Sequence, residues 1–136
     1  MPQVSVSRVV PEDLEQVWAR IGRFEDPNWL PGVTLSHMED ETRVLSVPPS
    51  QTIRETLLSS GEYVMSWATA ETPLPIADAV TTLSAKAVDD GTEVTWACTF
   101  TATQQVNAQA EAMMTSMVSD MLAAVAVDES IGETTD

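Results

Sequence analysis

The sequence of 136 residues contains a single cysteine, Cys98. One thiol excludes an internal disulfide and any metal site built from several cysteines. Cys98 has no histidine near it in the sequence, and it falls on the apolar face of a predicted strand. We therefore interpret it as a buried structural thiol.

Basic residues are also scarce: six Lys and Arg stand against 21 Asp and Glu, for a formal net charge of −15. A surface this negative repels phosphate backbones and anionic membranes, so we expect no nucleic acid partner. No apolar run reaches the length of a bilayer span, and the opening residues, MPQVSVSRVV, lack the apolar core of a signal peptide. We expect no membrane insertion and a cytoplasmic location.

Motifs for cofactor, metal or nucleophile chemistry are missing as well. The sequence contains no glycine-rich phosphate loop, HExxH or GxSxG, so nucleotide use, zinc proteolysis and serine hydrolysis have no support. Two acidic clusters, Glu39–Glu41 and Asp89–Asp90, fall in predicted turns and lack the spacing of a calcium loop. We predict no metal and no cofactor.

The sequence does contain a series of segments in which apolar and polar residues alternate, together with segments of helical periodicity. Period-2 alternation and turn residues predict seven strands, at Val4–Val9, Val33–Met38, Arg43–Val47, Thr52–Leu58, Tyr63–Thr69, Ala79–Val88 and Thr92–Ala102. A helix follows the first strand and ends at Gly22, and a brief second helix follows it. A long amphipathic helix closes the chain over residues 104–127.

This order of elements predicts an α+β fold. The long helix must bury its apolar stripe against the concave face of a curved antiparallel sheet, which is a helix-grip arrangement. We expect one domain over residues 1–127 and a polar, frayed tail over residues 128–136.

Several stretches in this order carry a family resemblance. VWARIGRFEDPNWLPGV, RVLSV, IRETL, PLP and TEVTWACTF before a long helix resemble the polyketide cyclase/dehydrase-like branch of the START/Bet v 1-like (SRPBCC) superfamily. The resemblance covers residues 4–122. It implies a seven-stranded sheet wrapped around the C-terminal helix, with two short helices after the first strand and a deep hydrophobic cavity. Members bind lipids, steroids, polyketides or aromatic molecules, and some catalyse cyclisation or dehydration. The short loops here predict a cavity smaller than a large lipid needs.

The alternation also indicates which side chains face such a cavity. The hairpin at PPSQ predicts that Arg43 lies opposite Glu55, and a four-residue DDGT loop predicts that Leu83 lies near Cys98 and Ala85 near Trp96. The predicted cavity residues are Trp29, His37, Arg43, Glu55, Tyr63, Trp67, Trp96, Phe100, Met113, Met114 and Met117.

Two sets of these residues, the Arg43–Glu55 pair and the methionines, each have two interpretations. Arg43 and Glu55 form either a solvated cross-strand ion pair or a desolvated pair that orients a ligand hydroxyl, carbonyl or carboxylate. The methionines are either core or a flexible ligand wall. His37 precedes an acidic turn, where a solvated position at the rim is the ordinary case.

Three functions fit the pattern. The first is intracellular binding of a small hydrophobic or aromatic molecule, by a monomer or homodimer. The second is a cofactor-independent cyclase or dehydratase in which Arg43, Glu55, His37 or Tyr63 polarises a carbonyl or moves a proton. The third is a structural or regulatory domain whose cavity is closed.

Overall fold

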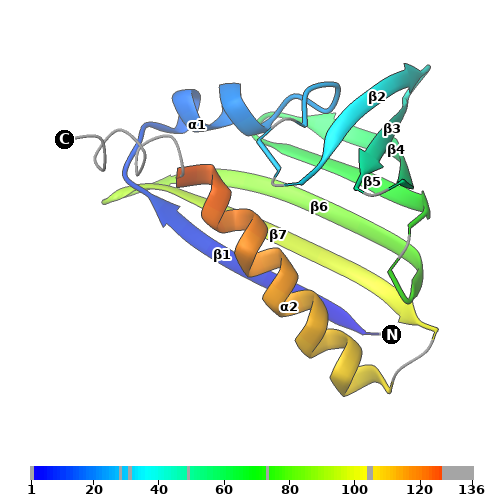
Figure 1. Cartoon of the computed structure of the whole chain (residues 1–136). Helices are drawn as coiled ribbons and strands as arrows, with labels where there is room; N and C mark the ends of the chain where they lie inside the picture. The colour runs from blue at the N-terminus through cyan, green and yellow to red at the C-terminus, as the bar shows by residue number, and fades with distance from the viewer. Residues whose placement is uncertain are drawn as a thin grey trace.

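The computed structural model describes residues 2–27, 29–30, 32–48, 50–72, 74–103 and 106–126. Its elements follow the predicted order (Figure 1). They are β1 (Gln3–Val10), α1 (Leu14–Ile21), β2 (Thr34–Glu39), β3 (Thr42–Val47), β4 (Gln51–Gly61), β5 (Val64–Glu71), β6 (Ile76–Val88), β7 (Gly91–Ala102), α2 (Asn107–Ala123) and a 3₁₀ turn, η1 (Ala124–Ala126).

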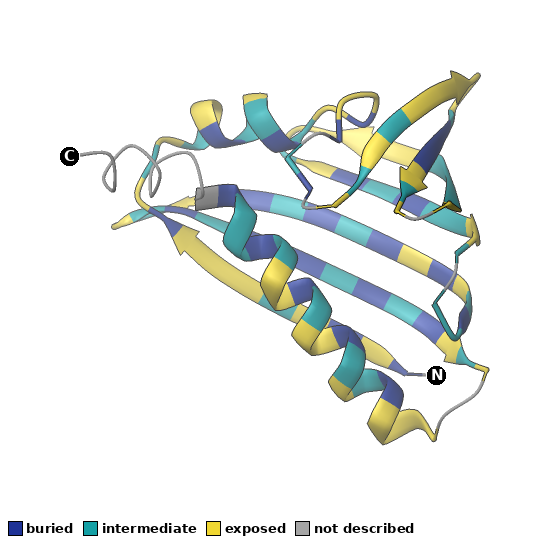
Figure 2. Ribbon diagram, in the orientation of Figure 1, coloured by how far each residue is buried: buried dark blue, intermediate teal, exposed yellow. Residues whose placement is uncertain are grey.

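All seven strands form one antiparallel sheet in the order β1-β7-β6-β5-β4-β3-β2. Six strands follow each other as a meander, and β1 pairs with β7 at the far edge. Buried and more exposed residues alternate along β6 and β7 (Figure 2), because successive side chains point to opposite faces of a strand. The buried residues of β7 are Thr92, Val94, Trp96, Cys98 and Phe100, and the last four are the apolar set that the sequence predicts.

The long helix α2 lies across the concave face over β1 and β7 (Figure 1). Its buried line is Ala110, Met114, Val118 and Leu122, spaced four residues apart, so that one narrow side of the helix meets the sheet. β3, β4 and β5 curve up at the other end of the sheet, away from α2 (Figure 1). This offset leaves part of the concave face without a helix over it.

The first helix also follows its sequence signals. α1 buries Val17 and Ile21 and ends at Gly22, whose N–H donates to Trp18 O at 2.7 Å. A side chain on Gly22 would collide with the Trp18 ring, which requires glycine there. The predicted brief second helix is not formed in the described part of the following segment, which makes turns around Phe24 and Leu30 instead.

The predicted register is correct for the β3–β4 hairpin and shifted by two residues for the β6–β7 hairpin. Arg43 pairs with Glu55, as predicted. Leu83, however, pairs with Trp96, and Ala85 pairs with Val94, because β6 and β7 are joined by a tight turn at Asp89–Asp90 and not by a four-residue loop. A shift of two residues keeps each side chain on its predicted face, so the predicted core survives the error.

The predicted polar tail, residues 128–136, lies outside the described residues. Within the described part of the chain, neither helix combines the length and the apolar content that a bilayer crossing requires.

Candidate functional site

A cavity of about 400 Å³ lies between the concave face of the sheet and α2. Every strand from β3 to β7 contributes to its wall, together with α2, the segment before β2 and the loop between β5 and β6. Its lining residues are Leu30, Gly32, Val33, Leu45, Val47, Gln51, Ile53, Glu55, Thr69, Thr72, Leu74, Ile76, Ala79, Thr81, Trp96, Cys98, Met114, Met117, Asp120 and Met121.

The cavity exists because of where small and large side chains fall. On the sheet, Ala79, Thr81 and Cys98 point into it, and these side chains are too short to reach α2. On the helix, Met117 and Met121 flank the buried line and are only partly buried. Flexible thioether side chains tolerate varied shapes in contact with them, which suits a ligand wall.

Trp96 lines this space and packs against two other tryptophans. Its ring meets Trp67 and Trp29 edge to face, with centroids 5.5 and 6.3 Å away. The indole is 6% exposed, and it both packs against these rings and lines the cavity. An aromatic face in the wall of an apolar cavity can stack on a flat ligand.

The main polar group facing the cavity is Glu55, which neighbouring strands hold in place. Arg43 Nε donates to Glu55 Oε1 at 2.8 Å, and Arg43 Nη2 lies 2.7 Å from the same oxygen. Thr69 Oγ1 donates to the other oxygen, Oε2, at 3.4 Å. Both partners sit opposite Glu55 in the β3–β4 and β4–β5 registers. The pair is therefore not the solvated cross-strand ion pair of the first interpretation, since its side chains are only 2% and 13% exposed.

Arg43 itself does not reach the cavity. Its Nη1 donates to Phe24 O at 3.0 Å, and its guanidinium stacks on the rings of Phe24 and Trp67, 4.2 and 4.7 Å from their centroids. The side chain is 2% exposed. Burial lowers the pKa of Arg43, and the Glu55 carboxylate opposes that shift by favouring the charged form.

Cys98 is the other titratable group in the wall near Glu55. Burial raises the pKa of its thiol, and the Glu55 carboxylate adds to the effect, while a hydrogen bond with Thr81 opposes it. The thiol is therefore a weak nucleophile at neutral pH. Among the described residues, no group of three His, Cys, Asp or Glu side chains is placed to hold a metal ion.

Of the eleven predicted cavity residues, Glu55, Trp96, Met114 and Met117 line the cavity. Another five lie beside it without forming its wall: Trp29, Arg43, Trp67, Phe100 and Met113. Trp67 and Phe100 are fully buried core residues, and Trp29 and Met113 are partly buried against that core.

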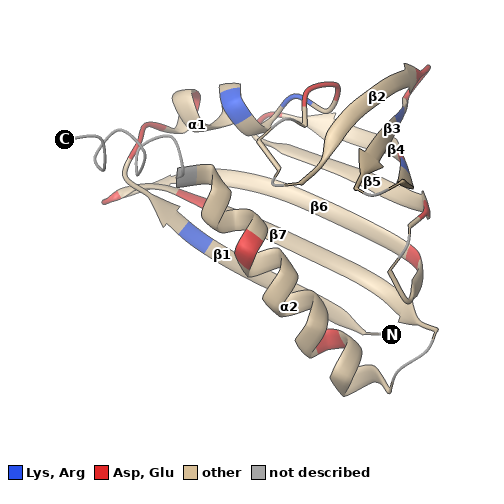
Figure 3. Ribbon diagram, in the orientation of Figure 1, with Lys and Arg blue, Asp and Glu red and all other residues tan. Residues whose placement is uncertain are grey.

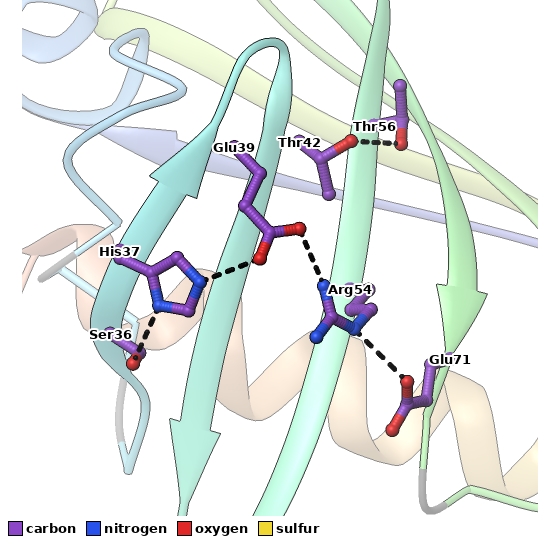
Figure 4. A network of polar contacts seen from close by, with 7 residues as sticks. All are labelled: Ser36, His37, Glu39, Thr42, Arg54, Thr56 and Glu71. Atoms are coloured by element: carbon purple, nitrogen blue, oxygen red, sulfur yellow. Dashed lines mark hydrogen bonds and ion pairs between the residues drawn. The ribbon is translucent and has the colours of Figure 1, made fainter.

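His37 and Tyr63 lie away from the cavity. A bulge between Leu35 and His37 reverses the alternation of β2, so the imidazole points to solvent and its Nε2 lies 2.8 Å from Glu39 (Figure 4). Glu39 also accepts from Arg54 at 2.8 Å, and these two partners lower its pKa. Tyr63 lies in the β4–β5 turn with a φ of 60°, and its ring meets Trp18 of α1.

Sequence reasoning did not single out the wall formed by the β5–β6 loop. Thr72 and Leu74 of that loop line the cavity, next to Ile76 and Ala79 at the start of β6. The two prolines in AETPLPIAD predict an ordered loop, but nothing in that pattern indicates which way its leucine and isoleucine face. Asp120 and Met121 also belong to the α2 wall, and Met121 is one of the helix methionines for which the sequence leaves core and ligand wall open.

The chain is similar to a known protein family and to several solved structures. Residues 1–128 match the family model described as polyketide cyclase/dehydrase and lipid transport. Among solved structures, an uncharacterized protein from Bacillus thuringiensis is 28% identical with a TM-score of 0.84, over 90% of this chain and 95% of that one. The protein XoxI from Bacillus cereus is 27% identical with a TM-score of 0.85, over 92% and 93%.

A more distant structure shares the fold alone. The Zhui aromatase/cyclase from Streptomyces sp. R1128 is 13% identical with a TM-score of 0.66, over 93% of each chain. No curated protein matches the sequence.

Proposed function

This chain belongs to the polyketide cyclase/dehydrase and lipid transport family, and from that premise we propose that it is an intracellular protein whose cavity binds a small hydrophobic or aromatic molecule. The observation that carries the proposal is the cavity of about 400 Å³ between the sheet and α2, with a largely apolar wall and a few placed polar groups. That combination is typical of small-molecule sites.

The size of the cavity supports a compact ligand. Small-molecule sites span roughly 300–1,000 Å³, and this one lies near the lower end of that range. Trp96 in the wall and methionines along α2 fit a flat ring system better than a long acyl chain. A closed-cavity regulatory domain would have this volume filled by its own side chains, which is not the case.

The arrangement of polar groups favours binding over cyclisation. Of the four candidate catalytic residues, Glu55 alone faces the cavity. Arg43 is covered by Phe24 and Trp67, and His37 and Tyr63 lie elsewhere. General acid–base catalysis needs a second group within hydrogen-bond reach of the substrate. Besides Glu55, the polar described residues of the wall are the amide Gln51, three threonines, the Cys98 thiol with its raised pKa, and Asp120.

The proposal is tested by fluorescence titration with N-phenyl-1-naphthylamine, a neutral aromatic probe that brightens in apolar surroundings. We expect saturable binding by the wild-type chain and loss of binding by Met117→Trp, which fills the cavity. Met113→Trp is the matched control, because Met113 packs on the same helix one turn away without lining the cavity. Equal binding by the wild type and both variants would show that the probe binds elsewhere.

A further inference from the structure

We propose that the cavity selects neutral or cationic ligands that carry a hydrogen-bond donor, which Glu55 accepts, and that it excludes carboxylates. This inference rests on the proposed function and specifies the chemistry of its ligand. It is argued from two adjacent groups. One oxygen of the Glu55 carboxylate is open to the cavity, and Arg43 lies behind it, where no ligand can reach.

Each of the three guanidinium nitrogens of Arg43 has a partner. Its Nε and Nη2 both meet Glu55 Oε1, its Nη1 donates to Phe24 O, and aromatic rings lie against its guanidinium. A ligand carboxylate or carbonyl would have to displace the Glu55 oxygen or a backbone bond to pair with it. The usual partner for an anionic ligand group is therefore present in the fold but closed off.

The carboxylate, in contrast, keeps one oxygen largely open among the described residues. Both contacts from Arg43 fall on Oε1, while the one bond that a described side chain donates to Oε2 comes from Thr69 and is long, at 3.4 Å. An ionised carboxylate has about four acceptor positions, so Oε2 retains capacity for a further donor. Because Glu55 lines the cavity, that donor comes from the ligand.

The other charged residue in the described part of the cavity wall is negative, like Glu55. Among the described residues of the cavity wall, the charged ones are Glu55 and Asp120, and both are acidic. Acidic side chains are also spread over the loops, strand ends and α2, with few basic ones among them (Figure 3). An anion entering this cavity loses its hydration and meets a carboxylate whose cationic partner is closed off, whereas an O–H or N–H group gains a charge-assisted hydrogen bond.

The experiment compares four ligands of one ring size: 2-naphthol, naphthalene, 2-(aminomethyl)naphthalene and 2-naphthoate. Each is titrated at pH 7 by displacement of N-phenyl-1-naphthylamine from the wild-type protein. We expect the naphthol and the ammonium ligand to bind about tenfold tighter than naphthalene, and naphthoate to bind the most weakly.

The outcomes separate the two proposals. Binding of naphthoate as tight as that of naphthol overturns the charge selection and leaves the binding function standing. Equal affinity of naphthol and naphthalene overturns the role of Glu55 as acceptor. Absence of any binding, by all four ligands and by the probe, overturns the binding function, and the selection with it.

Two double variants then assign the selection to the pair. Arg43→Leu with Glu55→Leu removes both charges together, so that neither is left buried alone. We expect the preference for naphthol over naphthoate to fall to within about threefold. The control is Thr42→Val with Thr56→Val, which removes the neighbouring cross-strand pair of the same two strands, a hydrogen bond of 2.7 Å outside the cavity wall. This control keeps the wild-type preference, and a preference unchanged in both variants overturns the assignment to Glu55.

Discussion

Arg43 and Glu55 lie opposite each other on β3 and β4, with Nη2 2.7 Å from Oε1, yet they occupy different environments. The arginine is closed in by Phe24 and Trp67, while the glutamate is 13% exposed and borders the cavity. Arg43 therefore holds Glu55 in place and neutralises its charge on the side of the core. Of the two side chains, the carboxylate alone lines the cavity.

The first prediction concerns the stability of this pair. Arg43→Met leaves the Glu55 carboxylate without its partner at the border of the core, and we expect a loss of about 3 kcal/mol in the free energy of unfolding. Arg43→Met combined with Glu55→Leu removes both charges and recovers most of that loss. Urea denaturation of the two single variants and the double variant measures the coupling between them. A coupling near zero would mean that solvent in the cavity already screens the pair.

The second prediction concerns the turn between β6 and β7. Gly91 has a φ of +141°, and a Cβ there would collide with Val10 O of β1. We expect Gly91→Ala to destabilise the chain by about 3 kcal/mol, from backbone strain and the collision together. Gly32→Ala is the control, because Gly32 also has a positive φ, +72°, but has open space around its Cβ position. Thermal unfolding of the two variants separates strain from collision, and equal losses would argue that the collision is relieved at little cost.

The third prediction concerns how the end of the chain's last helix is held. Arg20 Nη2 donates to Val125 O at 2.6 Å, just beyond α2, and also pairs with Glu12 Oε1 at 2.7 Å. A cation at a helix C-terminus is favourable because the last carbonyls carry partial negative charge. We expect Arg20→Met to cost about 1 kcal/mol and to speed hydrogen exchange in the last turn of α2. Arg8→Met, at an exposed position of β1, controls for the loss of one positive charge.

The period-2 pattern was sufficient to predict the sheet and the composition of its concave face. It predicted the buried apolar set of β7 and the pairing of Arg43 with Glu55, because both depend on local alternation and one short hairpin. It failed at His37, where a bulge adds a residue and turns the side chain outward, and at Tyr63, which belongs to a turn. The bulge at His37 has no composition signal such as glycine, whereas Gly61 marks the turn at Tyr63 without fixing the residue at which the next strand begins.

The cavity itself could be predicted only in outline. The small residues of β6 and the methionines of α2 indicate unfilled volume, but its location depends on α2 lying over β1 and β7. The covering of Arg43 depends on Phe24, nineteen residues earlier in the chain, in a segment of turns without periodicity. Contacts of that kind arise from tertiary packing, and they decide which half of an ion pair a ligand can reach.

The fourth prediction uses the single thiol as a reporter of the cavity. Because burial raises the pKa of Cys98, we expect iodoacetamide to alkylate the folded protein much more slowly than the urea-unfolded chain near pH 8.5, with the folded-state rate rising further into the alkaline range. The raised pKa also makes the stability depend on pH. Its contribution to the folded state is complete below the unfolded thiol pKa of about 8.5, and it is lost as pH rises through the higher pKa of the folded protein.

Since Cys98 lines the cavity, saturating N-phenyl-1-naphthylamine slows the alkylation of the wild type. The control, Cys98→Ala with Thr101→Cys, carries its thiol at an exposed position on the opposite face of β7 and reacts at a rate that the probe does not change. Mass spectrometry follows a single adduct in each case, and a Cys98 rate indifferent to the probe would mean that the thiol is reached by a route other than the cavity.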